Sequence, residues 1–288
     1  MTAPPPLDPR HYLDLVRRAV AEDVGTGDVT TAAIVPPDLR ATGVILAKRS
    51  CVVAGLAVAA SAFVEVDAET HWTAHVADGD ACPAGVVMAL VEGRAASLLT
   101  AERTALNFLQ HLSGIATLTR LLVEAAGGGL TVLDTRKTIP TLRALAKYAV
   151  RCGGGSNHRF GLFDAVLIKD NHVRVAGGIG PAVRSARAHA PGLTVEVEAQ
   201  SLDEVQAAID AGADIIMLDN LSDDAMREAV ARVGGRAKVE VSGNVTLARM
   251  PALARIGADA VSIGALTHSA PAADISLEIT LETGSAAR

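Results

Sequence analysis

The sequence predicts an α/β protein in which an N-terminal α+β sandwich domain is followed by an incomplete (β/α) barrel of about six parallel strands. Short β-branched runs recur along the second half of the 288-residue chain, and stretches with helical spacing separate most of them. In the first half, apolar and polar residues alternate and glycine-containing turns intervene, a pattern typical of antiparallel strands. The two halves are therefore expected to differ in architecture.

The N-terminal domain is expected to span residues 1–112. Helical spacing occurs at 11–24 and again at 97–126, where it continues into the second domain. Between these helices, antiparallel strands are expected within ATGVILAKRSCVVAG (41–55) and VADGDACPAGVVMALVEG (76–93). This order predicts a small sheet with helices packed on it.

The barrel is expected to span residues 113–271, and the tail 272–288 to return to the first domain. AGAD (211–214) is echoed by IGAD (256–259), and each glycine is predicted to end a helix just before a strand. Strands alternating with helices at this spacing indicate parallel strands joined by crossover helices. The predicted strands are TVLD (131–134), DAVLIK (164–169), LTVEVE (193–198), DIIML (214–218), AKVEVS (237–242) and DAVSIG (259–264).

Composition excludes several classes of protein. Half of the residues are apolar and a fifth are charged, which is ordinary for a globular protein. The formal net charge of −6 gives no basic field, so no nucleic acid partner is expected. The longest apolar stretch, 51–64, is too short to cross a bilayer, so no membrane partner is expected either. Cys51, Cys82 and Cys152 lack metal-finger spacing, which favours reduced thiols in a cytoplasmic protein.

Charged and small polar groups are sorted along the ends of the predicted strands. Because parallel α/β folds carry their sites at the carboxyl ends of the strands, these groups are expected to meet. His158 and Arg159 follow a glycine run in the long connection between the first two strands, and such a connection suggests a functional insertion. In chain order the strand ends supply cations (Arg136, Lys137, Lys169), then carboxylates (Glu196, Glu198, Asp219), then small groups (Ser242 to Asn244, Gly264).

Each of these residues also has a plain structural interpretation. Adjacent cations such as Arg136 and Lys137 are more often a solvated loop than a site, and Lys169 could extend along an apolar strand to solvent. Glu196 and Glu198 point to the same face of one strand, which is either the barrel interior or a solvated edge. A purely structural account would require coincidence at five strand ends, so the sequence favours a site.

The residue types indicate the chemistry of that site. Ser242–Gly243–Asn244 and Ile263–Gly264–Ala265 fit the phosphate cup that the last two strands of such barrels often form. Two carboxylates near a phosphate suggest a divalent metal, and oxygen ligands without histidine or thiolate clusters point to magnesium. Cations on the opposite side suggest an acidic second substrate. The predicted chemistry joins a phosphorylated donor to an acidic acceptor.

Eight segments resemble the quinolinate phosphoribosyltransferase family, the decarboxylating nicotinate-nucleotide pyrophosphorylases. Together they span nearly the whole chain. One departure stands out: Thr141 occupies a position where the family commonly has glycine, and it is expected to stiffen the loop after Lys137. The segments are EDVGTGDVTT (22–31), AERTALNFLQHLSGIAT (101–117), LDTRKT (133–138), CGGGSNHRFGLFDAVLIKDNH (152–172), VEVEAQ (195–200), DIIMLDN (214–220), VEVSGNV (239–245) and VSIGALTH (261–268).

The resemblance implies phosphoribosyl transfer from phosphoribosyl pyrophosphate to quinolinate with decarboxylation, giving nicotinate mononucleotide, pyrophosphate and CO₂ in de novo NAD biosynthesis. It implies that Arg103 reaches the site of a neighbouring subunit, hence a homodimer or a higher oligomer. The residues implied to hold quinolinate are Arg103, Thr135, Arg136, His158, Arg159 and Lys169.

The resemblance also implies catalytic roles for Lys137, Glu198 and Asp219. Mg²⁺ is the implied cofactor, held by Glu198 and Asp219 directly or through water or substrate, with Glu198 favoured over Glu196 as the nearer residue. Besides the three catalytic residues, the set implied to bind phosphoribosyl pyrophosphate comprises Ser242, Gly243, Asn244, Ile263, Gly264, Ala265 and His268.

Three other functions fit parts of the pattern. A transferase of the same fold could act on another pyridine carboxylate, although His158 and Arg159 beside Arg136 favour a dicarboxylate. A Schiff-base aldolase could use Lys169 or Lys137 as its nucleophile. A phosphate-sensing protein would keep the cup, but pure binding would need neither Glu198 nor Lys137.

Overall fold

A computed structural model describes residues 4–281 and divides the chain into two compact units. The first unit holds the described residues up to Leu118, the segment 144–154, and the residues from Ser269 onward. The second unit holds Thr119–Arg143 and Gly155–His268. The chain therefore passes between the units four times, and neither unit is a single continuous stretch. Residues 282–288 of the predicted returning tail lie outside the described residues.

The first unit is built on a four-stranded antiparallel sheet in the order β12–β1–β5–β3. Buried residues alternate along β1, so one face of the sheet packs on the core while the other is more exposed. The same unit also contains a separate two-stranded antiparallel sheet, formed by β2 and β4. The strands are β1 (Arg40–Ala47), β2 (Cys51–Val52), β3 (His71–Ala74), β4 (Ala81–Cys82), β5 (Val87–Arg94) and β12 (Ile275–Leu281).

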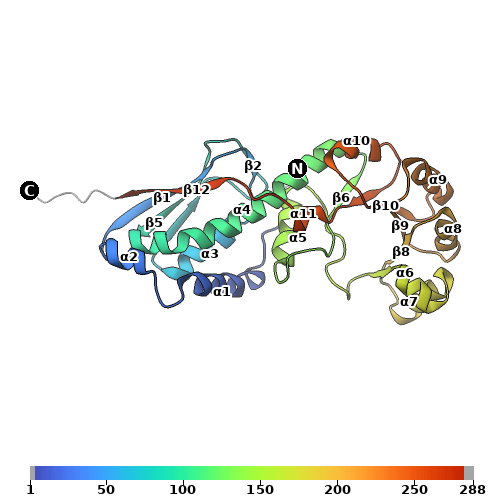
Figure 1. The fold of residues 1–288 in the computed structure, drawn as a ribbon, viewed down its shortest axis with the longest axis horizontal. Helices are drawn as coiled ribbons and strands as arrows, with labels where there is room; N and C mark the ends of the chain where they lie inside the picture. Colours follow the sequence, from blue (N-terminus) through green and yellow to red (C-terminus); the bar gives the residue numbers. More distant parts are fainter. Residues whose placement is uncertain (1–3, 282–288) are drawn as a thin grey trace, which may run out of the picture. The chain divides into compact units, whose positions relative to one another are not determined.

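Helices supply the second layer of this unit, and Figure 1 shows α1, α3 and α4 running alongside the sheet. Ile45 and Met88 of the strands and Leu98 and Leu109 of α4 are fully buried, so the core lies between the layers. The predicted α+β sandwich is confirmed. The helices are η1 (Pro9–His11), α1 (Leu13–Val24), α2 (Val29–Ile34), α3 (Leu56–Val66), α4 (Ala95–Ala126), which continues into the second unit, and α5 (Arg143–Cys152).

The second unit is built on six parallel strands in the order β6–β11–β10–β9–β8–β7. All six lie within the predicted runs or extend them by a residue, and their central residues are buried on both faces, as parallel strands require. Within the described residues no ladder joins β6 to β7, so the barrel is incomplete, as predicted. The strands are β6 (Thr131–Leu133), β7 (Val166–Ile168), β8 (Val195–Ala199), β9 (Ile215–Asp219), β10 (Lys238–Ser242) and β11 (Ala260–Ser262).

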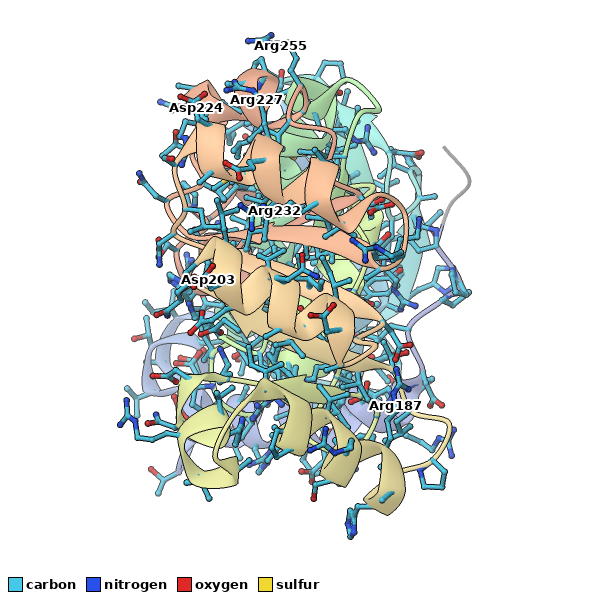
Figure 2. The ribbon with its side chains drawn as sticks, turned by 90° about the vertical axis from the view of Figure 1, so that its right-hand side faces the viewer. Arg187, Asp203, Asp224, Arg227, Arg232 and Arg255 are labelled. Carbon is cyan, nitrogen blue, oxygen red and sulfur yellow. The ribbon has the colours of Figure 1, made fainter. Side chains whose placement is uncertain are left out.

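Crossover helices cover this sheet, and Figure 2 shows charged side chains such as Asp203 and Arg232 on the outer surfaces of α8 and α9. Gly212 and Gly257, the two predicted helix-ending glycines, have φ values of +74° and +90°. The helix expected before Gly257 is divided into a 3-10 turn, Leu247–Arg249, and a short helix, Met250–Leu253, because Pro251 has no N–H to donate to the preceding turn. The helices are α6 (Asp170–Ala176), α7 (Ile179–His189), α8 (Leu202–Asp210), α9 (Asp223–Val233), η2 (Leu247–Arg249), α10 (Met250–Leu253) and α11 (Ala265–His268).

The connection between β6 and β7 returns to the open edge of the sheet beside β6. The Ser156 N–H donates to the Val132 carbonyl at 2.8 Å, and the Asp134 N–H donates to the Ser156 carbonyl at 3.2 Å. Ser156 thus pairs in parallel with Leu133. This pairing explains how a residue two positions further along, His158, arrives at the strand ends. Across residues 4–281, no helix is long and apolar enough to cross a membrane.

Candidate active site

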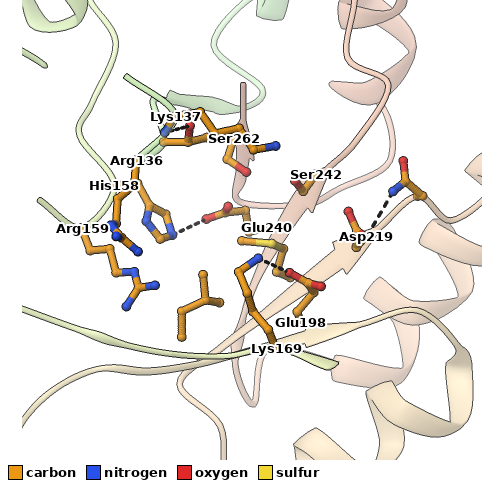
Figure 3. Close-up of a pocket in the computed structure, with 14 residues that line it drawn as sticks. Arg136, Lys137, His158, Arg159, Lys169, Glu198, Asp219, Glu240, Ser242 and Ser262 are labelled. Atoms are coloured by element: carbon orange, nitrogen blue, oxygen red, sulfur yellow. Dashed lines mark hydrogen bonds and ion pairs between the residues drawn. The ribbon is translucent and has the colours of Figure 1, made fainter. Parts of the chain in front are cut away.

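The carboxyl ends of the parallel strands surround a pocket of about 510 Å³ within the second unit. Figure 3 shows Arg136, His158 and Arg159 on one side and Asp219 on the other, with Lys169 and Glu198 between them. Nine residues predicted from the sequence line it: Thr135, Arg136, Lys137, His158, Arg159, Lys169, Glu198, Asp219 and Ser242. The strand-end pattern therefore identified residues that come together in space.

The loop after β6, which carries the first two cations, is held by Arg143. Its guanidinium donates to Thr138 Oγ1 at 3.2 Å, to the Phe160 carbonyl at 3.0 Å and to the Arg136 carbonyl at 3.4 Å. Because these acceptors belong to the two loops that carry Arg136 and Arg159, one side chain ties both loops together. The same loop contains Thr141 at φ +68°, a left-handed conformation that favours glycine.

The loop that carries His158 and Arg159 is anchored on Asp134, which is fully buried. The Asp134 carboxylate accepts the His158 N–H at 3.0 Å and the Asn157 side-chain amide at 2.6 Å. Arg159 donates to the Ala165 carbonyl at 3.2 Å, and burial, reinforced by nearby Arg136, lowers the pKa of its guanidinium. Two arginines are thus held close together at the cost of mutual repulsion, which a bound anion would relieve.

Lys169 and Glu198 form an ion pair across the pocket, with Nζ 2.6 Å from Oε2. The Glu198 side chain is 10% exposed and that of Lys169 is 46% exposed, so solvent reaches the lysine. A lysine whose Nζ is held by a carboxylate at this distance is not free to attack a carbonyl carbon as a Schiff-base nucleophile. This geometry argues against the aldolase alternative at Lys169.

Asp219 lies at the end of β9 and accepts amide hydrogens from its neighbours. Its Oδ2 receives the Asn220 side-chain amide at 3.1 Å and that of Gln200 at 3.4 Å. Asn220 in turn packs so tightly on Gly243, which has φ +89°, that a Cβ at that glycine would lie 2.1 Å from Asn220 Oδ1. Only glycine fits there, so Gly243 allows the ends of β9 and β10 to approach closely.

The remaining predicted residues lie outside the pocket lining. Gly264 is close to it, since a Cβ there would lie 2.9 Å from the Lys137 side chain and 3.3 Å from the His268 ring. Thr267 holds the same region by donating to the Lys137 carbonyl at 2.8 Å. Exposed Arg103 belongs to α4. Outside the lining, besides these, are Gly243, Asn244, Ile263 and Ala265.

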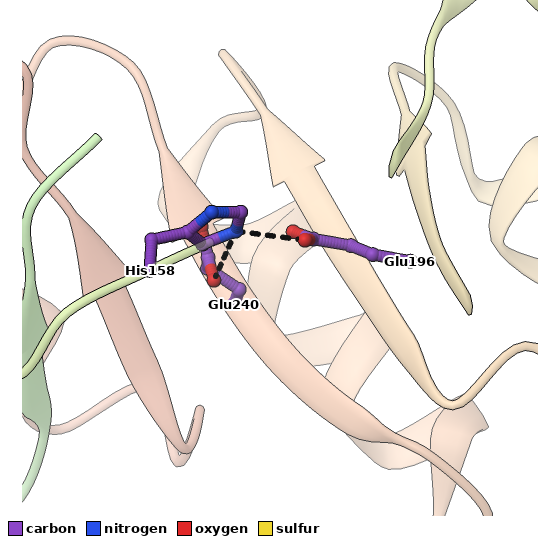
Figure 4. A group of neighbouring side chains, drawn as sticks. All are labelled: His158, Glu196 and Glu240. Atoms are coloured by element: carbon purple, nitrogen blue, oxygen red, sulfur yellow. Dashed lines mark hydrogen bonds and ion pairs between the residues drawn. The ribbon is translucent and has the colours of Figure 1, made fainter. Parts of the chain in front are cut away.

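One ionisable pocket residue, Glu240, escaped the sequence analysis. It lies on β10 and is 2% exposed, and Glu196 on β8 is equally buried. The His158 Nε2 is 2.7 Å from Glu196 Oε2 and 3.7 Å from Glu240 Oε2 (Figure 4). Burial, and then the charge of Glu196, raise the pKa of Glu240 to about 7. The signal was available, since VEVS (239–242) repeats the pattern of VEVE (195–198).

A pocket of this kind, at the carboxyl edge of a parallel sheet and lined by four permanent cations and several carboxylates, defines an enzyme for small polyanionic substrates. The chain matches the C-terminal domain of quinolinate phosphoribosyl transferase over residues 115–278 and its N-terminal domain over 28–113. It therefore belongs to the quinolinate phosphoribosyltransferase family.

Individual relatives agree with this assignment. A probable nicotinate-nucleotide pyrophosphorylase (carboxylating) from Bacillus subtilis is 42% identical, with 94% of each chain covered. The mitochondrial quinolinate phosphoribosyltransferase (decarboxylating) 2b of Nicotiana tabacum is 41% identical over 96% of this chain and 85% of its own. The solved structure of NadC from Streptococcus pyogenes superposes with a TM-score of 0.93 at 43% identity and covers 97% of this chain and 100% of its own.

Proposed function

We propose that this chain transfers the phosphoribosyl group of phosphoribosyl pyrophosphate to quinolinate with decarboxylation, and so forms nicotinate mononucleotide, pyrophosphate and CO₂ in de novo NAD biosynthesis. The observation that carries the proposal is a single pocket in which cations of two loops face the carboxylates of two strands, in a chain of this family. A transfer enzyme needs such a division, because it must hold two anionic substrates at once.

Quinolinate is assigned to the side of the pocket formed by Arg136, His158 and Arg159, together with Thr135 and Lys169. Arg136 Nε is buried without a hydrogen-bond partner among the described residues, so its fork retains capacity for a carboxylate. A pyridine dicarboxylate would supply the two negative charges that offset the repulsion between the neighbouring arginines.

Phosphoribosyl pyrophosphate is assigned to Lys137, Glu198 and Asp219. Its 5′-phosphate is assigned to the backbone of Ser242–Gly243–Asn244 and to the segment from Ile263 to His268. Support comes from Gly243 and Gly264, where the lack of a side chain lets main chain and neighbouring side chains approach closely.

Mg²⁺ is the proposed cofactor, and the donor set fits it. Among the residues that the structure describes, only side-chain amides donate to Asp219 Oδ2, and Glu198 directs one oxygen to Lys169. Carboxylate oxygens are the ligands that Mg²⁺ prefers, and it commonly binds through one or two of them together with substrate phosphates and water. Glu198 and Asp219 would hold it, and when bound it would stabilise the negative charge that develops on the leaving pyrophosphate.

The protein's own residues account for the remaining chemistry. As pyrophosphate leaves, C1 of the ribose gains positive charge, which the carboxylates of Glu198 and Asp219 stabilise, while Lys137 stabilises the leaving group. The pyridine nitrogen is a weak nucleophile, so the arginines act chiefly by holding it in line with C1. Once bonded, the positively charged nitrogen stabilises the carbanion that is left on the adjacent ring carbon when its carboxylate departs as CO₂, and that carbon then takes up a proton from solvent. No covalent enzyme intermediate is required.

The deciding experiment incubates the protein with quinolinate, phosphoribosyl pyrophosphate and Mg²⁺ and measures CO₂ and nicotinate mononucleotide. We expect both products in equal amounts, and none when any of the three components is omitted. Turnover of nicotinate but not of quinolinate would refute the substrate assignment and favour the other pyridine carboxylate transferase.

We further propose a cytoplasmic homodimer in which Arg103 of each chain completes the site of its partner. Arg103 is exposed on α4 and does not line the pocket of its own second unit, which is compatible with this role. Mixing an Arg103→Ala chain with a Lys137→Ala chain should restore up to about a quarter of the wild-type activity, because half of the dimers then hold one intact site of two. Absence of any recovery in exchanged dimers would contradict the proposal.

A further inference from the structure

A buried cluster of three titratable groups lies at the floor of the pocket. His158 comes from the β6–β7 connection, Glu196 from β8 and Glu240 from β10 (Figure 4). Their side chains are 11%, 3% and 2% exposed, and only His158 and Glu240 line the pocket. His158, the most exposed of the three, is therefore the group best placed to act on a bound molecule.

The charge of the cluster does not balance if both carboxylates are ionised. Glu196 Oε1 and Glu240 Oε1 are buried and have no hydrogen-bond partner in the described part of the chain. Two buried carboxylates that share one imidazole neighbour cannot both remain charged without a large electrostatic cost. Protons are the simplest way to remove that cost.

Distance decides where the charges reside. The His158 Nε2 is 1.0 Å nearer to Glu196 Oε2 than to Glu240 Oε2, at 2.7 Å against 3.7 Å. At 2.7 Å the contact is a short charge-assisted hydrogen bond, whereas 3.7 Å is too long for one. Glu196 is thus the partner of the imidazole, and Glu240 is the carboxylate that the cluster cannot neutralise except by protonation. The raised pKa of Glu240, whose first cause is burial, agrees with this order.

Other charged groups around His158 have opposing effects on the charge of its imidazole ring. Asp134 accepts its main-chain N–H, and its negative charge favours the imidazolium, whereas Arg136 and Arg159 disfavour it. Leu167 of β7, Met217 of β9 and Ser262 of β11 line the pocket without charge, and Lys169 is paired with Glu198. Of these groups, Glu196 makes the closest contact with the ring, so it has the largest influence on how the ring is held.

We infer that Glu196 is the positioning residue for His158: its short hydrogen bond with Nε2 holds the ring facing the pocket, whereas Glu240, which lies 1.0 Å further from Nε2 (3.7 Å against 2.7 Å), completes the floor without holding the ring. The role toward substrate rests on the proposed function, in which the ring would face a carboxylate of quinolinate. The cluster itself does not depend on that function. A pair of like residues, equally buried, would then have unequal roles.

The first test is nuclear magnetic resonance of the ¹⁵N-labelled histidine side chains, with the His158 signals assigned by a His158→Asn variant. We expect the Nε2 proton of His158 to be hydrogen-bonded and protected from exchange with solvent in the wild type and in Glu240→Gln, and to exchange more rapidly in Glu196→Gln. Rapid exchange of that proton in the wild-type protein would overturn the inference, and this measurement needs no substrate.

The second test is kinetic and uses the same pair of variants. Glu196→Gln should raise the KM for quinolinate about 10- to 100-fold, as expected for loss of a charged hydrogen bond, with the KM for phosphoribosyl pyrophosphate changed less than about 3-fold. Glu240→Gln, which is isosteric with the neutral acid, should alter either KM less than about 3-fold. Glu228→Gln on the exposed face of α9 serves as the matched control.

Each remaining outcome has a defined meaning. Equal damage from Glu196→Gln and Glu240→Gln would overturn the assignment of unequal roles. One equivalent of bound zinc or manganese that is lost in Glu240→Gln would also overturn it, because a metal would then neutralise the cluster. A wild-type protein that does not turn over quinolinate refutes the proposed function alone, since the ring signal still reports on the cluster.

Discussion

The two units treat their buried polar groups differently. In the first unit the carboxylates are satisfied locally: Asp67 accepts from Arg94 Nε at 2.9 Å and from Ser97 Oγ at 2.7 Å, and Asp78 accepts from the Tyr148 hydroxyl at 2.7 Å. The unpartnered buried atoms described there come from separate elements and belong to Thr70, His111, Arg151 and Ser276. In the second unit the corresponding atoms belong to Arg136, Glu196, Glu240 and Ser262, which lie together in or under one pocket.

This difference separates groups that hold the fold from groups that await a ligand. A buried polar atom without a partner costs free energy, and a protein retains several in one place only where something compensates. In the second unit a bound substrate or a proton compensates the unpartnered atoms of the pocket. In the first unit local hydrogen bonds compensate the carboxylates of Asp67 and Asp78. Substitutions in the two units should therefore affect different observables.

The largest expected effect is on activity. Arg136→Ala should lower kcat/KM for quinolinate about 1,000-fold, since a carboxylate loses a bidentate partner. The dissociation constant for phosphoribosyl pyrophosphate, measured by calorimetry, should change less than about 5-fold, and the melting temperature should change little. Arg227→Ala on exposed α9 is the control. Equal losses for both substrates would show that the site is divided differently.

The next largest expected effect is on the free energy of unfolding, and it comes from a substitution in the first unit. Asp67→Asn should lower the free energy of unfolding at pH 7 by about 2 kcal/mol, because a buried carboxylate loses its charged hydrogen bond to Arg94. Turnover should be unchanged within about 2-fold. Trp72, the only tryptophan of the chain, lies in β3 against Phe63 and reports the unfolding of this unit by fluorescence.

The pH dependence of the stability difference between the wild type and Asp67→Asn is the control for this prediction. Hydrogen bonds from Arg94, and then Ser97, hold the pKa of Asp67 below its ordinary range. A depressed carboxyl pKa means that the unfolded chain binds the proton more tightly, so the stabilisation is complete above the unfolded pKa near 4 and is lost as the pH falls through the folded value. The gap between the wild type and Asp67→Asn in urea denaturation should thus narrow as the pH falls below about 4, and it should close only below the folded pKa of Asp67. A gap independent of pH would contradict the assignment.

The smallest effect tests a strained position beside the site. Thr141→Gly should raise the free energy of unfolding by about 1 kcal/mol, because a threonine at φ +68° pays for a conformation that glycine adopts freely. Far-UV circular dichroism on heating should show the rise. Thr246→Gly, at φ −127°, should instead lower stability. A destabilised Thr141→Gly variant would show that the threonine side chain makes a compensating contact.

Strand positions in the second unit were predictable because each strand is a β-branched run closed by a turn, and every one of the six runs contains a strand. The site followed from them, since parallel strands bring their carboxyl ends to one edge. Asp134 and Arg143 could not be found this way. Their roles depend on contacts with residues 156–160, which come beside β6 only through the Ser156 pairing.

The two glutamates of β8 show a second limit. Alternation predicts that Glu196 and Glu198 share a face, and their order along the strand places Glu198 nearer its carboxyl end. In the structure Glu198 reaches the rim of the pocket and Lys169, while Glu196 lies under the pocket with His158. The order along one strand could not reveal the partners of Glu196, because His158 and Glu240 come from other parts of the chain. Thr141 is the opposite case, where one residue in the sequence marked the loop that the structure shows in a left-handed conformation.

The position of β12 has a consequence for biosynthesis. β1 is an inner strand only because residues 275–281 pair along its whole length. At ordinary rates of translation, those residues emerge roughly 10 to 45 seconds after β1 has been made. During that interval the nascent first unit presents an open, alternating apolar edge, while every strand of the second unit is already available to pair. A chain that ended before residue 275 would therefore carry an active-site barrel together with an aggregation-prone edge.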